Sequence, residues 1–444
     1  MRRSVMTTDQ AVYREGSLDV PEGLPRGIDL GRINNREIAL ARYGRDYTER
    51  LTDHALLGDD HAYRAFLDFK DKSKNASWRM FEQALDHGID SLDDPSDGLV
   101  GLFEQLDHVP DWVDWDQLYR GAIAVWRVGP AAPMVLTYCS IGAGFSMYSS
   151  TRPVLFSGRL KDQQEVGGRL TESFRYVVSA YGPGQMTRKG DGFRLTAKVR
   201  MIHAAVRNTL SHSPHWDWEA WGLPISNLDS MNTQAGQFGV TLVDGIRAAG
   251  IRLSDQEEED IFALSRYVGW VIGIPESILH TNVDDARMKV KFHKLVELPA
   301  DDLCREVVKT IIEYASEKPP GDAEILPAAV AKFMTTERRT HLAWGLIQNW
   351  QPKYVNEMLG VEKTPWRFAM PVAKPFISAA DRISRLLPHD DEAKAMKTIK
   401  MLGGAIELPD DQREQEVANP ETLTADIAAN KGKVPRRSKQ TVGV

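Results

Sequence analysis

Apolar residues recur three and four positions apart along most of this chain, and that spacing constrains the fold more than any other feature. It places the apolar side chains on one side of a helix, whereas the alternating runs that indicate strands are scarce. The spacing is clear in "DDHAYRAFLDF", "WDQLYRGAIAVWRVG", "GGRLTESFRYVVSAY" and "EEEDIFALSRYVGWVIG". The sequence therefore predicts an all-α fold.

The composition is that of a globular protein and excludes several classes of function. Of the 444 residues, 42% are hydrophobic and 26% are charged, which is enough for a large core. A net charge of −7 argues against a nucleic-acid partner. The two cysteines, Cys139 and Cys304, provide neither a disulfide framework nor a CxxC pair. The N-terminal twenty residues lack the apolar run of a secretory signal, so we expect a cytoplasmic protein.

The pattern predicts one large domain between two polar ends. We expect an N-terminal arm over 1–30, a single helical catalytic domain over 31–404 and a flexible polar tail over 405–444. Within the domain, the glycine-rich segment 181–193 is expected to connect two helices, because no strand precedes it. Ser254 and Glu257 have the spacing of a capping box at a helix start.

One stretch, residues 128–151, is uncharged and long enough to cross a bilayer. It contains Gly129, Pro130 and Pro133, with further glycines and many hydroxyl residues. These residues favour a buried core helix over a membrane span. We therefore expect no stable membrane insertion.

A histidine between two arginines marks the helix predicted around "AKVRMIHAAVRNTL". Arg200, His203 and Arg207 share one face of it. The two cations would favour the neutral imidazole that binds metal, and they would themselves need anions. Haem b offers both partners, since its iron binds imidazole and its propionates bind guanidinium groups. The alternative is an ordinary half-exposed helix whose arginines meet Asp or Glu and whose histidine bonds a carbonyl.

A second polar strip lies earlier in the chain. Arg169, Glu172 and Ser173 share one helix face opposite apolar residues, although Arg169 and Glu172 alone would be read as an ordinary salt bridge. The other histidines carry less information. "HSPH" lacks the further ligands of a zinc site, and the lone histidines His61, His293 and His341 are expected to be hydrogen-bonded structural residues.

The two strips, in this order, resemble the signature of the latex clearing protein (rubber oxygenase) and MpaB-type oxygenase family. "GRLTES" is similar to its Arg-x-x-[Glu/Lys]-Thr element, and "VRMIHAAVR" resembles its Arg-x-x-His-x-x-x-Arg element. The resemblance spans roughly residues 50–350 and includes the long helical region that begins at "WGLPISNLDSMNTQAGQ".

The resemblance implies a globin-like helical core that holds one b-type haem. His203 corresponds to the axial ligand of the haem iron, and Arg200 and Arg207 correspond to the arginines beside it. Arg169, Glu172 and Ser173 correspond to polar catalytic positions at the pocket. This chain departs from the family where Ser173 replaces threonine, and its segment before Arg169 offers only Glu165 as an upstream base.

These observations lead to the hypothesis of a haem b-dependent oxygenase that uses O₂ on a small apolar substrate, unsaturated and isoprenoid-like. Two alternatives remain at this point. One is a non-catalytic haem carrier or gas sensor on the same fold, and the other is a haem-free helical interaction protein.

Overall fold

The computed structural model describes residues 20–70, 74–140, 144–156, 163–317, 333–351, 353–386 and 390–403. For residues 70, 74–76 and 163–170 it describes the helical backbone and not the side chains. Within these ranges the chain forms helices and no strand, which confirms the all-α prediction. The expected tail over 405–444 and most of the expected arm lie outside the described residues, so this division of the chain stays a prediction.

The first half of the chain forms short and medium helices. In order they are η2 (Gly27–Asp29), α1 (Arg36–Tyr43), α2 (Arg45–Asp53), α3 (Asp60–Lys70), α4 (Lys74–His87), η3 (Ile89–Ser91), α5 (Asp97–Asp107), α6 (Trp115–Trp126), α7 (Ala131–Val135), η4 (Leu136–Ser140), α9 (Tyr148–Phe156), α10 (Gln163–Ala180) and α11 (Asp191–Ser211).

The second half continues in the same way. Its elements are α12 (Trp218–Trp221), α13 (Asn227–Asn232), η5 (Thr233–Val240), α14 (Thr241–Ala248), α15 (Asp255–Val271), η6 (Glu276–Ile278), α16 (Val283–Val296), α17 (Asp302–Glu317), α19 (Thr336–Trp350), α20 (Lys353–Met358), η8 (Pro365–Phe368), α21 (Ala369–Leu386) and α22 (Asp391–Gly403).

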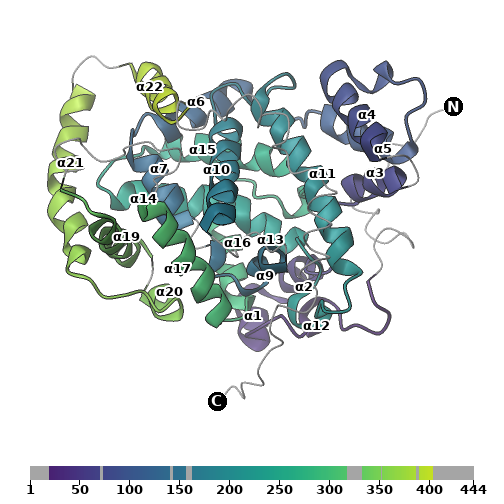
Figure 1. The fold of residues 1–444 in the computed structure, drawn as a ribbon, viewed down its shortest axis with the longest axis horizontal. Coiled ribbons are helices and arrows are strands. Elements are labelled where there is room, and N and C mark those ends of the chain that lie inside the picture. The colour runs from purple at the N-terminus through teal and green to yellow at the C-terminus, as the bar shows by residue number, and fades with distance from the viewer. Residues whose placement is uncertain are drawn as a thin grey trace.

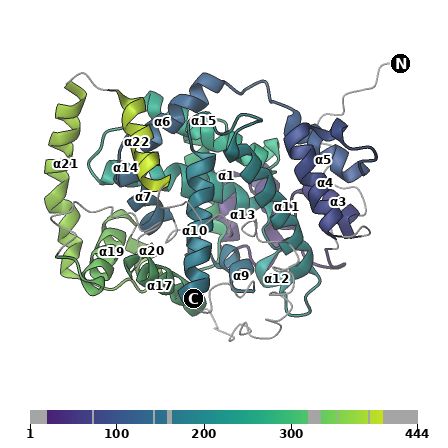
Figure 2. The ribbon, with the colours of Figure 1, turned by 45° about the horizontal axis from the view of Figure 1, so that its top comes forward.

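Helices α10, α11 and α15 lie in the middle of the molecule (Figure 1). Helix α15 packs along α6, and α11 packs against α3, α10 and α15. Helices α3, α4 and α5 gather at one end, and α19, α20 and α21 at the other, an arrangement that Figure 2 shows from a second direction. One cluster of buried apolar side chains forms the main core. Its first member in the sequence is Leu30 and its last is Leu402, so residues from both ends of the described chain contribute to it.

Local sequence signals explain where several helices begin and end. Ser254 and Glu257 form the expected capping box at the start of α15. The glycine-rich segment connects α10 to α11, as predicted. The segment "REIALARYGRDYTERL" has continuous helical spacing, but it forms α1 and α2, because Gly44 between them has φ +79°.

The described part of the uncharged stretch 128–151 is largely buried, as expected, but it is not the single helix that we predicted. Gly129 has φ +65°, and the chain then forms α7, the π-helix η4 and, after a break at Met147, α9. Proline and glycine divide the stretch because neither supports a continuous helical ladder. No helix among the described residues is long and apolar enough to span a membrane.

Two π-helices, η4 and η5, pack against each other in the core. The Ser140 hydroxyl on η4 donates to the Gln237 carbonyl on η5, at 2.9 Å. Their sequences have ordinary helical spacing, so periodicity did not predict the wider turns. In other proteins, such wider turns are concentrated at functional sites.

Candidate functional site

Helix α11 carries the predicted Arg–His–Arg strip as one face of a 21-residue helix. It begins after Gly190 and ends where the His212 ring donates a hydrogen bond from Nδ1 to the Asn208 carbonyl, at 2.7 Å. Its apolar residues face two separate clusters, with Met201 in the main core and Val206 in a smaller aromatic cluster. The strip with His203 is held between these two packed faces.

Arg200 has a full set of internal partners. Its Nε atom lies 2.5 Å from Asp59 Oδ2, and its Nη2 atom lies 2.8 Å from Asp59 Oδ1. Nη1 donates to the Gln105 side chain and, at 3.3 Å, to the Val271 carbonyl. Burial would raise the pKa of Asp59, but the Arg200 charge and hydrogen bonds hold that pKa below its ordinary value. Arg200 therefore has an acidic side chain of the protein, Asp59, as its partner, as the alternative to a haem propionate required.

Arg207 is in a different position, although it lies only two turns further along α11. It is 2% exposed, and only its Nη2 atom has a hydrogen bond, to the Ile225 carbonyl at 2.8 Å. Among the described residues, its Nε and Nη1 atoms are buried and have no hydrogen-bond partner. Burial lowers the pKa of Arg207 to about 10. Buried guanidinium donors without an acceptor are costly, so this residue has the properties of an anion-binding group.

His203 and Arg207 line the same small pocket. Its wall also includes Asp59, Asn227, Ser230 and the segment 272–274. Two glycines allow the close packing here. A Cβ atom at Gly58 would lie 2.6 Å from Arg207 Nε, and one at Gly273, where φ is +96°, would lie 2.4 Å from Asp59 Oδ2. The pocket therefore places an imidazole and an unsatisfied guanidinium beside each other.

The second predicted strip lies on α10, which packs against α11. Arg169 belongs to this helix, but its side chain and that of Glu165 lie outside the described part of the chain. The Glu172 side chain is half-buried and Ser173 is exposed. A short loop joins the end of α10, Ala180, to the start of α11, Asp191. Position 169 is eleven residues before Ala180 and position 203 is twelve residues after Asp191, so the two positions lie at similar distances from this loop along their helices.

The two histidines of "HSPH" lie apart from the pocket that His203 lines. His212 and His215 are exposed at the end of α11 and belong to no described group of possible metal ligands. The tryptophan-rich segment after them contains the short helix α12, which Asp217 caps by accepting a hydrogen bond from the Ala220 amide. Trp216 and Trp221 from this segment pack edge to face, with ring centres 5.0 Å apart. The segment thus closes the smaller aromatic cluster beside α11.

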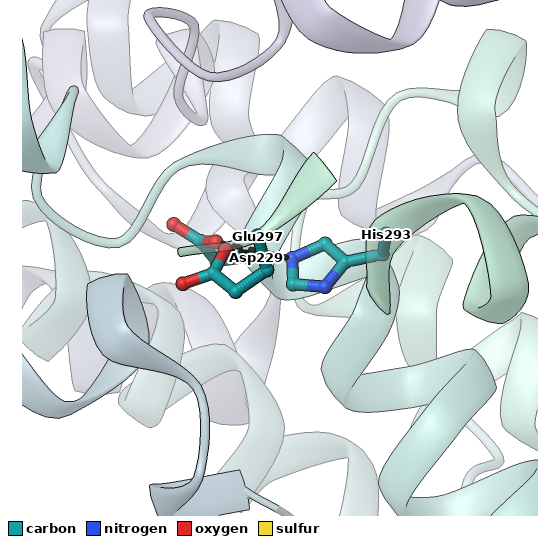
Figure 3. Close-up of side chains that lie close together, drawn as sticks. All are labelled: Asp229, His293 and Glu297. Atoms are coloured by element: carbon teal, nitrogen blue, oxygen red, sulfur yellow. Dashed lines mark hydrogen bonds and ion pairs between the residues drawn. The ribbon is translucent and has the colours of Figure 1, made fainter. Parts of the chain in front are cut away.

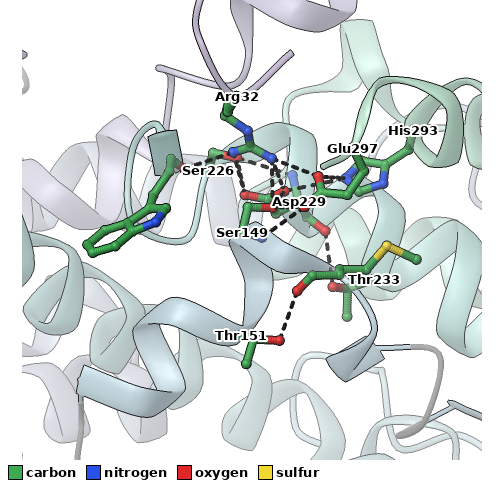
Figure 4. Close-up of polar contacts among 10 residues, drawn as sticks. Arg32, Ser149, Thr151, Ser226, Asp229, Thr233, His293 and Glu297 are labelled. Carbon is green, nitrogen blue, oxygen red and sulfur yellow. Dashed lines mark hydrogen bonds and ion pairs between the residues drawn. The ribbon is translucent and has the colours of Figure 1, made fainter. Parts of the chain in front are cut away.

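A second buried polar cluster, which the sequence did not reveal, lies between α9, α13 and α16. We call it the Arg32 cluster. Its members are Arg32, Ser149, Asp229, His293 and Glu297 (Figure 4). Arg32 forms a bidentate pair with Asp229, at 2.7 and 3.0 Å, and also donates to Glu297 at 3.2 Å. Burial opposes both charges, yet the pair holds the pKa of Asp229 below its ordinary value and raises that of Arg32.

Three members of this cluster have the chemistry of metal ligands. The His293 ring points toward the carboxylates of Asp229 and Glu297, and ligand atoms of all three lie within 4.8 Å of one another (Figure 3). However, the Arg32 guanidinium already donates to both carboxylates, and its positive charge would repel a cation placed among them. The cluster is therefore a buried ion-pair network. Within it, the Nε2 atom of His293 lies 3.4 Å from Asp229 Oδ1.

Comparison with known proteins shows the class to which this fold and site belong. The structure resembles that of a latex clearing protein in the closed state, with a TM-score of 0.60, 17% identity, and 80% of this chain and 91% of the other covered. The sequence is similar to a rubber oxygenase of Streptomyces sp. (strain K30), at 23% identity over 297 residues, which is 61% of this chain and 68% of the relative. The protein is an oxidoreductase of the oxygenase class.

The family follows from a longer match. Residues 126–380 match the family described as "ER-bound oxygenase mpaB/B'/Rubber oxygenase, catalytic domain". This match includes α10, α11 and the Arg32-cluster residues Asp229, His293 and Glu297. Since it covers more than half of the chain, the chain belongs to this family. The family resemblance inferred from the two sequence strips is thereby confirmed.

Proposed function

We propose that this protein is a haem b-dependent oxygenase that uses O₂ on an apolar, unsaturated substrate of isoprenoid type. The observation that carries the proposal is Arg207, a buried guanidinium with two unsatisfied donors in the same pocket as His203. A haem propionate would supply the missing acceptor, and the imidazole would supply an axial ligand to the iron.

The arginines of α11 have different roles in this proposal. Arg207 binds a propionate, and His203 binds the iron. Arg200, which corresponds to a second haem-side arginine of the family, is already held by Asp59 and therefore fixes the helix that carries His203. When bound, the haem supplies the iron centre at which O₂ is activated.

The α10 strip would form the polar side of the reaction pocket. Arg169 and His203 lie at similar distances from the connecting loop on two helices that pack together. This supports a position for Arg169 near the haem that His203 is proposed to bind. Glu172 and Ser173 lie about one turn closer to the connecting loop. We assign proton transfer to a carboxylate of this helix, Glu172 or Glu165, and assign to Ser173 the hydroxyl role of the family threonine.

The substrate class rests on the relatives. Both are named for rubber or latex, and rubber is an apolar, unsaturated polymer of isoprene units. A shorter molecule of the same chemistry fits the cytoplasmic location that we propose. The two cysteines support that location, because Cys139 and Cys304 are buried free thiols, as expected in a reducing compartment.

An absorption spectrum of the purified protein tests the proposal. We expect the wild type, expressed with haem available, to show a Soret band and to contain about one haem per chain. His203→Ala should purify with little or no haem while remaining helical by circular dichroism, because Val199, Ile202 and Val206 still pack the helix. Added imidazole should restore part of the band.

The matched control is His212→Ala, which removes a histidine from the end of the same helix and leaves the pocket intact. It should retain wild-type haem content. A wild-type protein without a Soret band would refute the haem proposal, and full haem occupancy in His203→Ala would refute the ligand assignment.

The α10 residues are tested separately by oxygen consumption with an apolar unsaturated substrate. Arg169→Ala should keep its haem and lose most of its turnover, since it is assigned to the reaction pocket and not to the iron. Ser173→Thr should retain both haem and turnover, because it keeps the hydroxyl. Equal turnover of Arg169→Ala and wild type would show that Arg169 has no catalytic role.

A further inference from the structure

Helix α21 packs on the molecule through polar residues and through Met370 and Ile377, which join an apolar cluster with Ala249 and Leu346. The Ser378 hydroxyl donates to the Gly250 carbonyl at 2.8 Å, and the Arg252 amide donates to Asp381 at 3.2 Å. Arg385, one turn after Asp381, donates to the Arg252 carbonyl. Ser378, Asp381 and Arg385 are partly buried, so the face of α21 that contacts the protein combines these polar residues with Met370 and Ile377.

The outward side of α21 is apolar. Val372, Phe376, Ile383 and Leu386 follow one another at intervals of four, seven and three residues, which places them on one face of the helix. They are 65%, 74%, 58% and 80% exposed, and Phe368, just before the helix, is 57% exposed. We call these five residues the α21 stripe. Single exposed apolar residues are common on proteins, but a continuous stripe of this kind marks an interaction surface.

The position of the helix leaves the stripe accessible. Helix α21 lies at the outer edge of the molecule in both ribbon views, and no other labelled helix lies beyond it (Figures 1 and 2). Its neighbours in the described structure, α19 and η8, contact it from the inner side. The stripe therefore faces solvent in the structure of the single chain.

The charges around the stripe are basic, although the chain as a whole is acidic. Residues 363–386 contain five basic side chains and one acidic side chain, in a protein of net charge −7. The acidic residue, Asp381, is on the inward side and bonded to Arg252 and Arg385. Arg367 lies over the ring of Phe368, and Arg367, Arg382 and Lys363 are exposed, with the exposed Glu362 directly before Lys363. Lys374 is also exposed, but it belongs to the inward side, where its Cγ atom approaches Gly250.

We propose that the α21 stripe is a docking surface for an anionic lipid bilayer, on which the helix lies in the plane of the interface. An apolar face flanked by Lys and Arg, with aromatic residues in the face and modest overall hydrophobicity, is the pattern of interfacial helices. No described helix is suited to crossing a bilayer, so this contact is peripheral.

The charge pattern favours lipid over a second copy of the chain. Two copies that met through the stripe would bring the exposed basic residues of one beside those of the other, with no exposed carboxylate from residues 363–386 to compensate. Anionic headgroups supply the opposite charge, at about 1 kcal/mol for each Lys or Arg near the surface, or roughly fivefold in affinity. This inference rests on α21 alone and does not depend on the haem proposal.

Vesicle sedimentation with the full-length protein tests the proposal. We expect the wild type to sediment with vesicles of phosphatidylcholine and phosphatidylserine and to bind far less to phosphatidylcholine alone. Phe376→Glu/Ile383→Glu should weaken binding by at least about tenfold, because each change removes an apolar side chain from the interface. Arg367→Gln/Arg382→Gln, which keeps the apolar face, should weaken it about 25-fold and reduce its salt dependence.

The control is Ile38→Glu/Val109→Glu. It makes the same change of charge at two apolar residues, 53% and 43% exposed, that lie outside α21. It should bind vesicles as the wild type does. The proposal is overturned if the wild type does not bind anionic vesicles, if this control loses binding equally, or if light scattering shows a dimer that Phe376→Glu/Ile383→Glu dissociates.

Discussion

Arg200 and Asp59 form a buried bidentate ion pair that fixes α11 to the start of α3. Arg200 is 1% exposed and Asp59 is 6% exposed, so solvent does not screen the pair. Asp59 is 141 positions away in sequence, and it also lines the pocket that contains His203 and Arg207. The pair therefore positions the helix that carries the proposed haem ligand.

Removing the charge of Asp59 should destabilise the protein strongly. Asp59→Asn leaves the Arg200 guanidinium buried without a counter-charge, and breaking such a pair costs about 3–5 kcal/mol. Urea unfolding of the haem-free protein measures the change in the free energy of unfolding. The neighbouring Asp60→Asn is the control, because its Arg64 partner is 48% exposed and the pair contributes less than about 1 kcal/mol. Equal effects of the two substitutions would contradict the positioning role of Asp59.

Replacing Arg207 should have opposite effects on the haem-free and haem-bound proteins. Arg207→Met keeps a long side chain and removes a buried charge that has unsatisfied donors. The haem-free protein should therefore become more stable in urea, by about 1–3 kcal/mol. Haem transfer to apomyoglobin should be faster from this variant than from wild type, because a propionate loses its partner. A variant that destabilises the haem-free protein would indicate that Arg207 has a structural partner instead of a ligand.

The sequence predicted the features that depend on local spacing. The helices, the capping box at Ser254 and the shared face of Arg200, His203 and Arg207 all follow from periods of three and four residues. Partners distant in sequence could not be predicted in this way. Nothing near Arg200 indicates that Asp59 neutralises it, and nothing near Asp229 indicates Arg32, which is 197 positions away. The spacing predicted the same haem-side role for Arg200 and Arg207. In the folded protein only Arg200 forms an ion pair with a carboxylate, that of Asp59, among the described residues.

The Arg32 cluster provides a test of whether Asp229, His293 and Glu297 hold a metal ion. In the wild type we expect neither EDTA nor Zn²⁺ to change the melting temperature, because Arg32 already neutralises the carboxylates. Arg32→Met should lose about 3–5 kcal/mol of stability by leaving the two carboxylates uncompensated. Zn²⁺ should then restore part of the loss, since the three potential ligands lie within 4.8 Å of one another.

Two observations would change this interpretation. A lower melting temperature of the wild type in EDTA would indicate a resident metal ion. Arg45→Met provides the matched control, because its one described ion pair, with Glu49, is exposed and weak, so the substitution should have little effect and create no response to Zn²⁺.

Buried neutral histidines should make the fold sensitive to mild acid. Burial lowers the pKa of His280 to about 4, while its Nε2 atom lies 2.9 Å from the Phe262 carbonyl. Burial also lowers the pKa of His54 to about 4. As the pH falls below 6.5, the unfolded chain binds protons before the folded chain does, so the free energy of unfolding decreases. The loss should extend from pH 6.5 to about 4 and reach about 3 kcal/mol for each histidine.

His280→Gln isolates one of these contributions. The amide of glutamine can still donate to the Phe262 carbonyl but does not titrate, so the decrease between pH 6.5 and 4 should be smaller by up to about 3 kcal/mol than in wild type. Urea unfolding at half-unit intervals of pH measures this difference. His212→Gln, at an exposed position, should keep the wild-type slope. If His280→Gln also kept that slope, His280 would have the same pKa in the folded and unfolded chains, and burial would not be the cause of the acid sensitivity.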